Sequence, residues 1–286
     1  FHYLIFRPNV VLGTPIIITL VGYILRYKSI VLQEDDFDII EKTANLGYPF
    51  ASFIISPSVC RTGKFDDKVI KYDGYHELAY LHPDLFVPDK KIVDKYIKSD
   101  NPYFIIRFAK LTAHHDVGIK GISNNLANEI ISRLEKYGQV FISSERKLNS
   151  ALDKHRISID PKDVHHVMAF ADMYIGDSQT MAAESGVLGV PFIRFNDFVG
   201  RISYLKELEE NYSLGYGIRT NQTKLLMSKI DELLNMENRL DIFQKRRGAM
   251  LNDKINLVNF LSWIIDEYPN SFDILKKNPN YQDNFK

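Results

Sequence analysis

Short apolar runs alternate along this chain with longer stretches in which apolar residues recur at helical spacing. This alternation is typical of β–α–β units, in which helices cover a sheet of parallel strands. We predict strands at residues 10–12, 29–32, 53–55, 69–70, 103–108, 140–142, 173–175 and 190–195. Helices are predicted up to about residue 27 and at 122–134, 164–171, 180–188, 222–235, 237–250 and 253–267. The pattern indicates two α/β units in tandem with a helical tail.

A polar stretch with two prolines, residues 85–102, separates the two series of strands and helices. Such composition is typical of a connection between domains. We therefore place a first Rossmann-like domain at residues 1–90, a second at 91–250 and the tail at 251–286. The first unit lacks an opening strand, so we expect it to be truncated at its N-terminus.

Lysine plus arginine and aspartate plus glutamate both number 36, so the formal net charge is zero. This removes bulk attraction to nucleic acid, and we expect no nucleic-acid partner. The one cysteine, Cys60, excludes a disulfide framework and suits a reducing cytoplasm. The most apolar stretch, residues 10–25, is shorter than the roughly 20 residues that span a bilayer. We expect a cytoplasmic protein, and leave peripheral association with the inner face of the membrane open.

One strand of the second unit ends in the stretch GDSQTMAAESGVLGVP, residues 176–191. Open α/β sheets bind ligands where the carboxyl end of a strand leads into a helix. Ser178, Gln179 and Thr180 place hydroxyls and backbone N–H groups there, and a helix N-terminus stabilises phosphate. Glu184 lies one turn beyond Thr180, where its carboxylate can accept hydrogen bonds from ribose hydroxyls. The alternative is a capped helix with one solvated glutamate.

This stretch belongs to a longer segment, ADMYIGDSQTMAAESGVLGVPFIRF, that resembles the donor site of GT-B nucleotide-sugar enzymes. Further matching pieces are FRPNVVLGT, SIVLQEDD, YDGYHELAYLHP and IIRFAKLTAHHDVG, and together they span most of residues 6–205. The resemblance is close to an uncharacterised bacterial family, described only as a domain of unknown function. It is distant to the related UDP-N-acetylglucosamine 2-epimerases and glycosyltransferases.

The resemblance implies a GT-B-like fold, with two Rossmann-like units whose parallel sheets face a cleft. The first domain would be the acceptor side, the second would bind the nucleotide sugar, and the helix in 251–286 would pack back on the first domain. GT-B proteins open with a strand and a glycine-rich loop, which nothing before Phe1 supplies. We expect the start of the chain to be absent from this sequence, and a reduced form of the protein is the alternative.

The resemblance also implies which residues of the second unit bind the donor. The diphosphate would lie at Ser178, Gln179 and Thr180, and the ribose at Glu184. Backbone at Ile159 would read the nucleobase. The start of the following helix would close the site, and His165 is the nearest titratable group, with an ordinary surface or core histidine as the alternative.

The loop LTAHHDVG, which follows the first strand of the second unit, faces the cleft in a GT-B protein. His114 and His115 are candidates to bind diphosphate or to protonate a leaving phosphate. A metal is not expected, because adjacent side chains rarely share one ligand direction and GT-B enzymes generally use no metal at the donor. Arg107, at the end of the strand, is a second phosphate candidate, with a strand-end salt bridge as the alternative.

Two acidic stretches of the first unit are candidates for proton transfer. Glu34, Asp35 and Asp36 follow a predicted strand, and His76 and Glu77 lie close to the domain junction. Sugar chemistry commonly needs a carboxylate or a histidine as base. With His115, these residues are our candidate catalytic groups, although a run of acidic residues is also typical of a solvated surface.

The sequence favours a glycosyltransferase that displaces UDP from a UDP-sugar, in the assembly of surface polysaccharide or glycoconjugate on a sugar or lipid-linked acceptor. A non-hydrolysing UDP-N-acetylglucosamine 2-epimerase-like enzyme is the alternative. A non-catalytic nucleotide-sugar-binding protein is the third interpretation. The nucleotide sugar would be the substrate, with no cofactor and no metal.

Overall fold

The computed structural model describes residues 5, 8–110 and 121–286. The chain forms two compact units. Unit 1 comprises the residues up to Ala79 together with Arg201–Tyr204 and Asn252–Lys286, and unit 2 comprises Tyr80–Gly200 and Leu205–Leu251. The segment 201–204 and the C-terminal residues thus belong with the N-terminal part of the chain.

Unit 1 contains a sheet of four parallel strands in the order β1-β2-β3-β4. The strands are β1 (Val10–Gly13), β2 (Lys28–Leu32), β3 (Phe53–Pro57) and β4 (Val69–Tyr72). The remaining elements are α2 (Ile17–Leu25), α3 (Phe37–Gly47), η1 (Tyr48–Phe50), η2 (Gly63–Lys68), α13 (Leu257–Asp266), α14 (Asn270–Lys277) and η5 (Pro279–Phe285), and α4 (Leu78–Leu81) begins at its edge.

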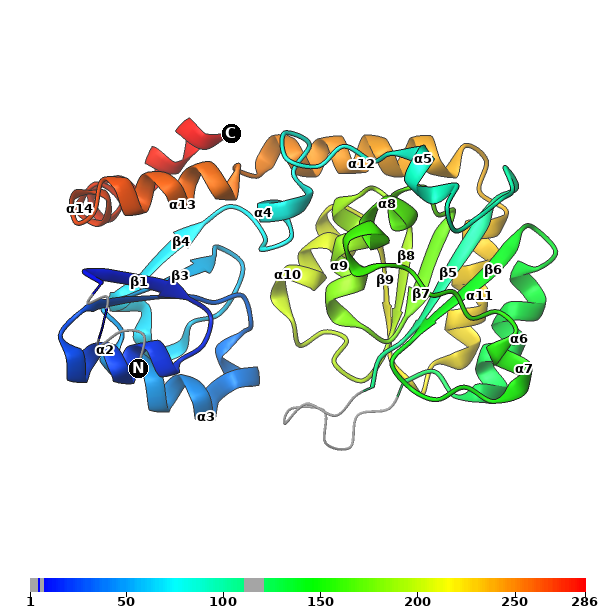
Figure 1. The fold of residues 1–286 in the computed structure, drawn as a ribbon, viewed down its shortest axis with the longest axis horizontal. Helices are drawn as coiled ribbons and strands as arrows, with labels where there is room; N and C mark the ends of the chain where they lie inside the picture. Colours follow the sequence, from blue (N-terminus) through cyan, green and yellow to red (C-terminus); the bar gives the residue numbers. More distant parts are fainter. Residues whose placement is uncertain (1–4, 6–7, 111–120) are drawn as a thin grey trace. The chain divides into compact units, whose positions relative to one another are not determined.

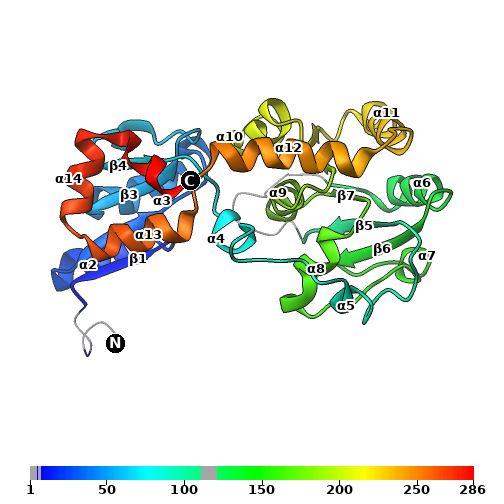
Figure 2. The same ribbon diagram turned by 90° about the horizontal axis from the view of Figure 1, so that it is seen from above.

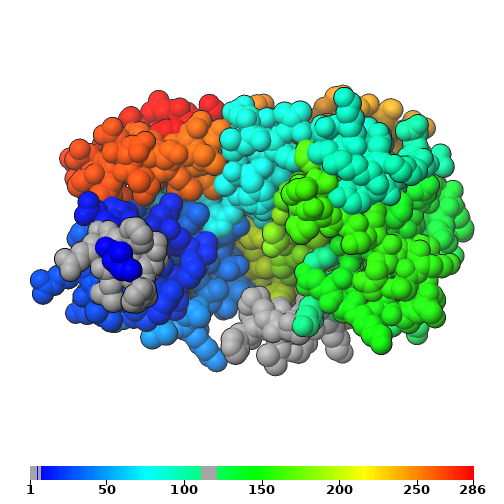
Figure 3. Space-filling model, in the orientation of Figure 1, coloured from blue at the N-terminus to red at the C-terminus, as the bar shows by residue number. Residues whose placement is uncertain are grey.

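The alternation of side chains along the strands gives this sheet two buried faces. Ile30 and Ile55 point to one face, where they form a core with residues of α13 and α14 such as Phe260. Val31 and Ile54 point to the other face, which α3 and η1 cover. Figure 1 shows the two helical layers on opposite faces, and Figure 3 shows the orange and red atoms of the C-terminal segment packed against the first unit.

Unit 2 contains a sheet of five parallel strands in the order β6-β5-β7-β8-β9. The strands are β5 (Tyr103–Phe108), β6 (Gln139–Ser144), β7 (Met173–Gly176), β8 (Phe192–Phe195) and β9 (Gly215–Ile218). The helices within unit 2 are α5 (Lys90–Val93), α6 (Asn124–Leu134), α7 (Ser150–Asp153), η3 (Pro161–Asp163), α8 (Val164–Ala169), α9 (Gln179–Val187), η4 (Glu207–Asn211) and α11 (Thr223–Leu234). Helix α10 (Ser203–Lys206) begins with residues assigned to unit 1, and α12 (Arg239–Asp253) ends with such residues.

Helix α9 lies close to this sheet because its inner face carries only small side chains. Ala182, Ala183 and Ser185 are fully buried, and a Cβ at Gly186 would stand 2.9 Å from the ring of Phe192. The helix ends before Gly189, whose positive φ of 75° suits glycine at this position. Figure 2 shows α9 beside β7. The predicted arrangement of two α/β units with parallel sheets is confirmed.

None of the helices in the described part of the chain combines the length and the apolar character needed to cross a bilayer.

The packing of α13 predicts how strongly the C-terminal segment stabilises unit 1. Phe260 is fully buried, whereas Ile265 on the same helix is partly exposed. We expect Phe260→Ala to lower the free energy of unfolding by about 3–5 kcal/mol, because it removes a buried ring and leaves a cavity. The matched Ile265→Ala should cost less than about 1 kcal/mol. Urea unfolding measures both values, and equal costs would contradict this packing.

Candidate functional site

The N-terminus of α9 lies at the carboxyl end of β7, where the sequence predicts a donor site. Ser178 is the N-cap residue, with an extended backbone, and its Oγ accepts the Met181 N–H at 3.4 Å. Ser178 and Gln179 are half-buried, and Thr180 is exposed. The first turn of the helix thus combines hydroxyls with the partial positive charge of the helix dipole, an arrangement that suits an anion.

Glu184 is 8% exposed, so it is not the solvated glutamate of the alternative interpretation. Its Oε1 accepts a hydrogen bond from the hydroxyl of Tyr80 at 3.0 Å and lies 3.0 Å from Nε2 of His165 in α8. The rings of Tyr80 and His165 are neighbours, with centroids 5.4 Å apart. The structure therefore unites two predicted donor residues and adds Tyr80, which the sequence analysis missed.

A buried arginine fixes the side chain of Gln179. Arg194 in β8 is fully buried, and its Nη1 donates to Oε1 of Gln179 at 2.7 Å. The Nε and Nη2 of Arg194 both donate to Oε1 of Glu209, at 2.9 and 2.7 Å. Burial raises the pKa of Glu209, and the Arg194 charge opposes this shift. A buried, paired charge thus holds one residue of the helix N-terminus in place.

Arg107 forms a salt bridge at the end of its strand, which the sequence analysis gave as the alternative to a phosphate contact. Its Nη1 donates to the Ser143 hydroxyl at 2.7 Å, and its Nη2 pairs with Glu145. A role at the donor phosphate stays a prediction. Ile159 is half-buried in the irregular segment before η3, and its contact with a nucleobase also stays a prediction.

Asp177, next to the N-cap, is a buried carboxylate that the sequence analysis did not single out. Its Oδ1 accepts the Ala109 N–H at 2.6 Å, and its Oδ2 accepts the Ile122 N–H at 3.4 Å and lies 3.5 Å from Nη2 of Arg146. Burial raises its pKa despite these donors. Asp177 thus ties two separate backbone segments to the start of α9. The predicted residues His114 and His115 lie outside the described residues.

In unit 1, the structure brings together Glu34, His76 and Glu77. Oε1 of Glu34 accepts the His76 backbone N–H at 2.7 Å, and its Oε2 lies 3.5 Å from Nδ1 of the same histidine. Glu77 is 2% exposed. Burial, and then the charge of Glu77, raise the pKa of Glu34 well above its usual value, and burial lowers the pKa of His76 to about 4. Burial therefore favours the neutral form of both groups.

The cluster of Glu34, His76 and Glu77 can accept and donate protons. The imidazole of His76 is neutral near pH 7, and its Nε2 has no hydrogen-bond partner among the described residues. A carboxyl with a raised pKa, as Glu34 has, is typical of a general acid or base. The structure thus groups the predicted residues His76 and Glu77 with Glu34, which belongs to the same acidic run after β2 as the predicted aspartates.

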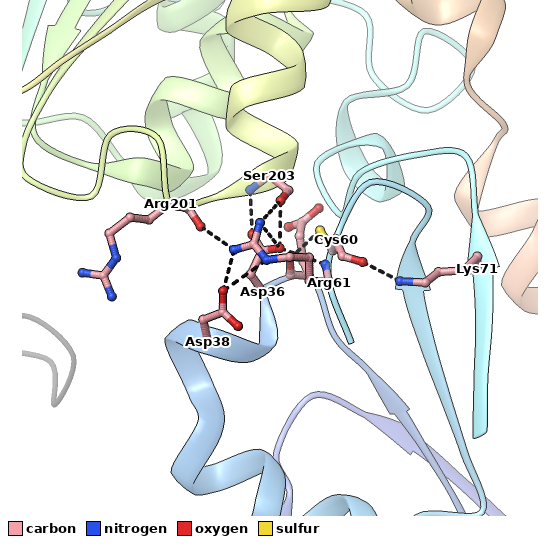
Figure 4. A network of polar contacts seen from close by, with 8 residues as sticks. Asp36, Asp38, Cys60, Arg61, Lys71, Arg201 and Ser203 are labelled. Carbon is pink, nitrogen blue, oxygen red and sulfur yellow. Dashed lines mark hydrogen bonds and ion pairs between the residues drawn. The ribbon is translucent and has the colours of Figure 1, made fainter. Parts of the chain in front are cut away.

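Asp35 and Asp36 do not lie together as a pair of solvated acids. Asp35 is exposed, whereas Asp36 is fully buried. The two oxygens of Asp36 accept the backbone N–H groups of Arg61 at 2.8 Å and Ser203 at 2.6 Å, and the Ser203 hydroxyl at 2.8 Å. Figure 4 shows Arg61 also reaching Asp38 and the carbonyl of Arg201. These contacts fit a residue that anchors the segment 201–204, and a catalytic role for Asp36 stays a prediction.

Within the described residues, no group of three or more histidine, cysteine, aspartate or glutamate side chains has the geometry to hold a metal ion.

Comparison with known proteins gives a consistent fold and no sequence relative. No protein-family model and no curated protein sequence matches the chain. UDP-GlcNAc 2-epimerase from Methanocaldococcus jannaschii matches with a TM-score of 0.58 at 14% identity, over 87% of this chain and 78% of that one. HepE from Anabaena, in complex with UDP and glucose, matches with a TM-score of 0.61 at 11% sequence identity, over 91% of this chain and 78% of HepE. Spinosyn forosaminyltransferase matches with a TM-score of 0.59 at 12% sequence identity, over 93% of this chain and 78% of the transferase. The fold is therefore GT-B-like, and epimerases and glycosyltransferases share it.

The raised pKa of Glu34 predicts a pH-dependent stability. Glu34 ionises near its usual pKa in the unfolded chain but resists ionisation in the fold, so the wild type loses stability as pH rises through the interval between the two values. Glu34→Gln keeps an acceptor for the His76 N–H but no longer titrates. We expect its stability relative to wild type to increase as the pH rises from about 5, just above the usual pKa of glutamate, measured by urea unfolding.

Glu41→Gln is the matched control, because Glu41 is exposed on α3. Its stability relative to wild type should change little over the same pH range. A flat or falling difference for Glu34→Gln would contradict the raised pKa.

Proposed function

We propose that this chain transfers a glycosyl group from a UDP-sugar to a sugar or lipid-linked acceptor, in the assembly of surface polysaccharide or glycoconjugate. The observation that supports the proposal is the pairing of the N-terminus of α9 with Glu184 one turn further along the helix, buried and held by Tyr80 and His165. A nucleoside diphosphate matches both groups, since its phosphates carry negative charge for the helix N-terminus and its ribose hydroxyls can donate to the Glu184 carboxylate. The GT-B-like fold supports the proposal, since HepE has that fold and was solved with UDP.

In the proposed reaction, the first turn of α9 binds the diphosphate and Glu184 accepts hydrogen bonds from the ribose. A base removes the proton of the acceptor hydroxyl, whose oxygen forms a bond to the anomeric carbon. The bond from that carbon to the UDP oxygen breaks, and UDP leaves with the electron pair. The helix N-terminus stabilises the negative charge that develops on the phosphate.

The cluster of Glu34, His76 and Glu77 supplies the base in this proposal. A histidine with a pKa of about 4 is unprotonated at neutral pH, the form that a general base needs, although burial makes it a weak base. Asp35 and His115 stay as further proposed catalytic groups. We propose that the protein works in the cytoplasm, with peripheral association at the membrane where a lipid-linked acceptor would lie.

The paired carboxyls of the same cluster favour a second candidate function. An epimerase must remove and return a proton at C2 of the sugar, and a carboxyl with a raised pKa beside a second, buried carboxyl suits that exchange. A UDP-N-acetylglucosamine 2-epimerase-like activity is therefore the alternative. A protein that only binds the nucleotide sugar would have the donor site without turnover.

The donor site predicts protection by UDP. A ligand that binds only the folded chain stabilises it by mass action, so UDP at about 100 times its dissociation constant should add about 2.7 kcal/mol. Glu184→Ala should remove most of this shift, because it removes the ribose contact. The exposed Glu237 provides a matched control, Glu237→Ala, that should keep the shift. If UDP and common UDP-sugars leave the melting temperature of the wild type unchanged, the donor site is wrong.

The cluster predicts loss of turnover without loss of binding. We expect His76→Ala and Glu77→Gln each to reduce product formation from UDP-sugars by about 100-fold or more, the usual effect of losing an acid or base. The melting shift with UDP should persist in both variants. Product analysis with and without acceptor lipids separates the candidate functions, since only transfer needs an acceptor. Wild-type rates in both variants would exclude the cluster from the chemistry.

A further inference from the structure

Helix α2 presents an apolar face to solvent. Residues 17, 20 and 24 follow helical spacing and share the side opposite Ile18 and Gly22, which are buried. Ile24 is 73% exposed and Tyr23 is 70% exposed. The outward face of a helix in an α/β unit is normally polar, so α2 has apolar side chains all round where only one side is needed for the fold.

Neighbouring elements extend this surface. Leu46 at the end of α3 and Phe50 in η1 are also exposed, and the rings of Tyr23 and Phe50 lie 5.1 Å apart. Helices α2 and α3 cover the same face of the sheet of unit 1 (Figure 1). We call the exposed residues Ile17, Tyr23, Ile24, Leu46 and Phe50, together with the half-buried Leu20, the α2 patch. Contiguous exposed apolar residues of this kind mark a site of interaction.

Basic residues border the α2 patch. Arg26 and Lys28 follow α2 directly and are exposed, and Lys42 lies one turn before Leu46 on α3. The half-buried Lys68 is not part of this rim, because its Nζ donates to the carbonyls of Tyr48, Pro49 and Ala51. Glu41 is the acidic residue next to Lys42. An apolar surface with tyrosine and a basic rim matches the boundary of a bilayer with anionic headgroups.

We propose that the α2 patch docks unit 1 on an anionic lipid bilayer, with its apolar side chains at the boundary of the acyl chains and its basic rim at the headgroups. This proposal identifies the surface that makes the membrane contact in the proposed function. It rests only on that membrane contact and not on the donor site. A helix as short as α2 cannot span the bilayer, so in this proposal α2 lies in the plane of the membrane surface.

Sedimentation of the intact protein with vesicles tests the proposal. We expect the wild type to bind vesicles of mixed phosphatidylcholine and phosphatidylglycerol more strongly than vesicles of phosphatidylcholine alone, and salt to weaken this preference. The double variant Tyr23→Ser/Ile24→Ser should reduce partitioning by about tenfold or more, because it removes the apolar contact. Arg26→Gln/Lys28→Gln should reduce the preference for the anionic vesicles.

Leu85→Ser/Val87→Ser is the matched control, because Val87 in unit 2 is 75% exposed, as Ile24 is, but lies outside the patch. This variant should bind vesicles as the wild type does, and thermal melting followed by circular dichroism checks that each variant folds. Failure of the wild type to bind anionic vesicles, or equal loss in the control, would overturn the proposal. So would a dimer that becomes monomeric in the Tyr23→Ser/Ile24→Ser variant, since the patch would then bind a second copy. The assay contains no nucleotide sugar, so its failure leaves the donor site unaffected.

Discussion

The close approach of α9 to the sheet of unit 2 is the constraint on which the candidate donor site depends. Because the inner face of α9 carries glycine, alanine and serine, the helix packs directly against the sheet. A single methyl group at Gly186 would already be too close to Phe192. The first turn therefore stays at the carboxyl end of β7. One turn later, Glu184 is carried into a buried position where Tyr80 and His165 hold one of its oxygens. The packing of α9 against the sheet thus also fixes the positions of the candidate donor residues.

Local signals predicted most of the fold. The apolar runs marked the parallel strands β1 to β8 but missed β9, whose sequence GYGI has no apolar run. Ser178 and Gly189 marked the two ends of α9 because capping depends on residues that are adjacent in the chain. The small residues of α9 also revealed its close packing. Ser178, Gln179 and Glu184 could be singled out for the same reason, since their positions relative to one helix follow from spacing alone.

The partners of these residues could not be predicted, because they depend on contacts between distant parts of the chain. Tyr80 reaches Glu184 across 104 positions. The acidic run after β2 shows the same limit. The sequence could not tell that Asp36 is buried by Ser203, 167 positions away, or that Glu34 rather than Asp35 lies against His76. Charge runs usually indicate a solvated surface, and only the tertiary contacts reveal which members of the run are buried.

The central claim is that the first turn of α9 and Glu184 together bind a nucleoside diphosphate. A crystal structure of the protein with UDP tests it most directly. The account predicts phosphate oxygens within hydrogen-bond distance of the backbone N–H groups that follow Ser178, and ribose hydroxyls within about 3.2 Å of the Glu184 carboxylate. UDP bound elsewhere, or a ribose that points away from Glu184, would contradict it.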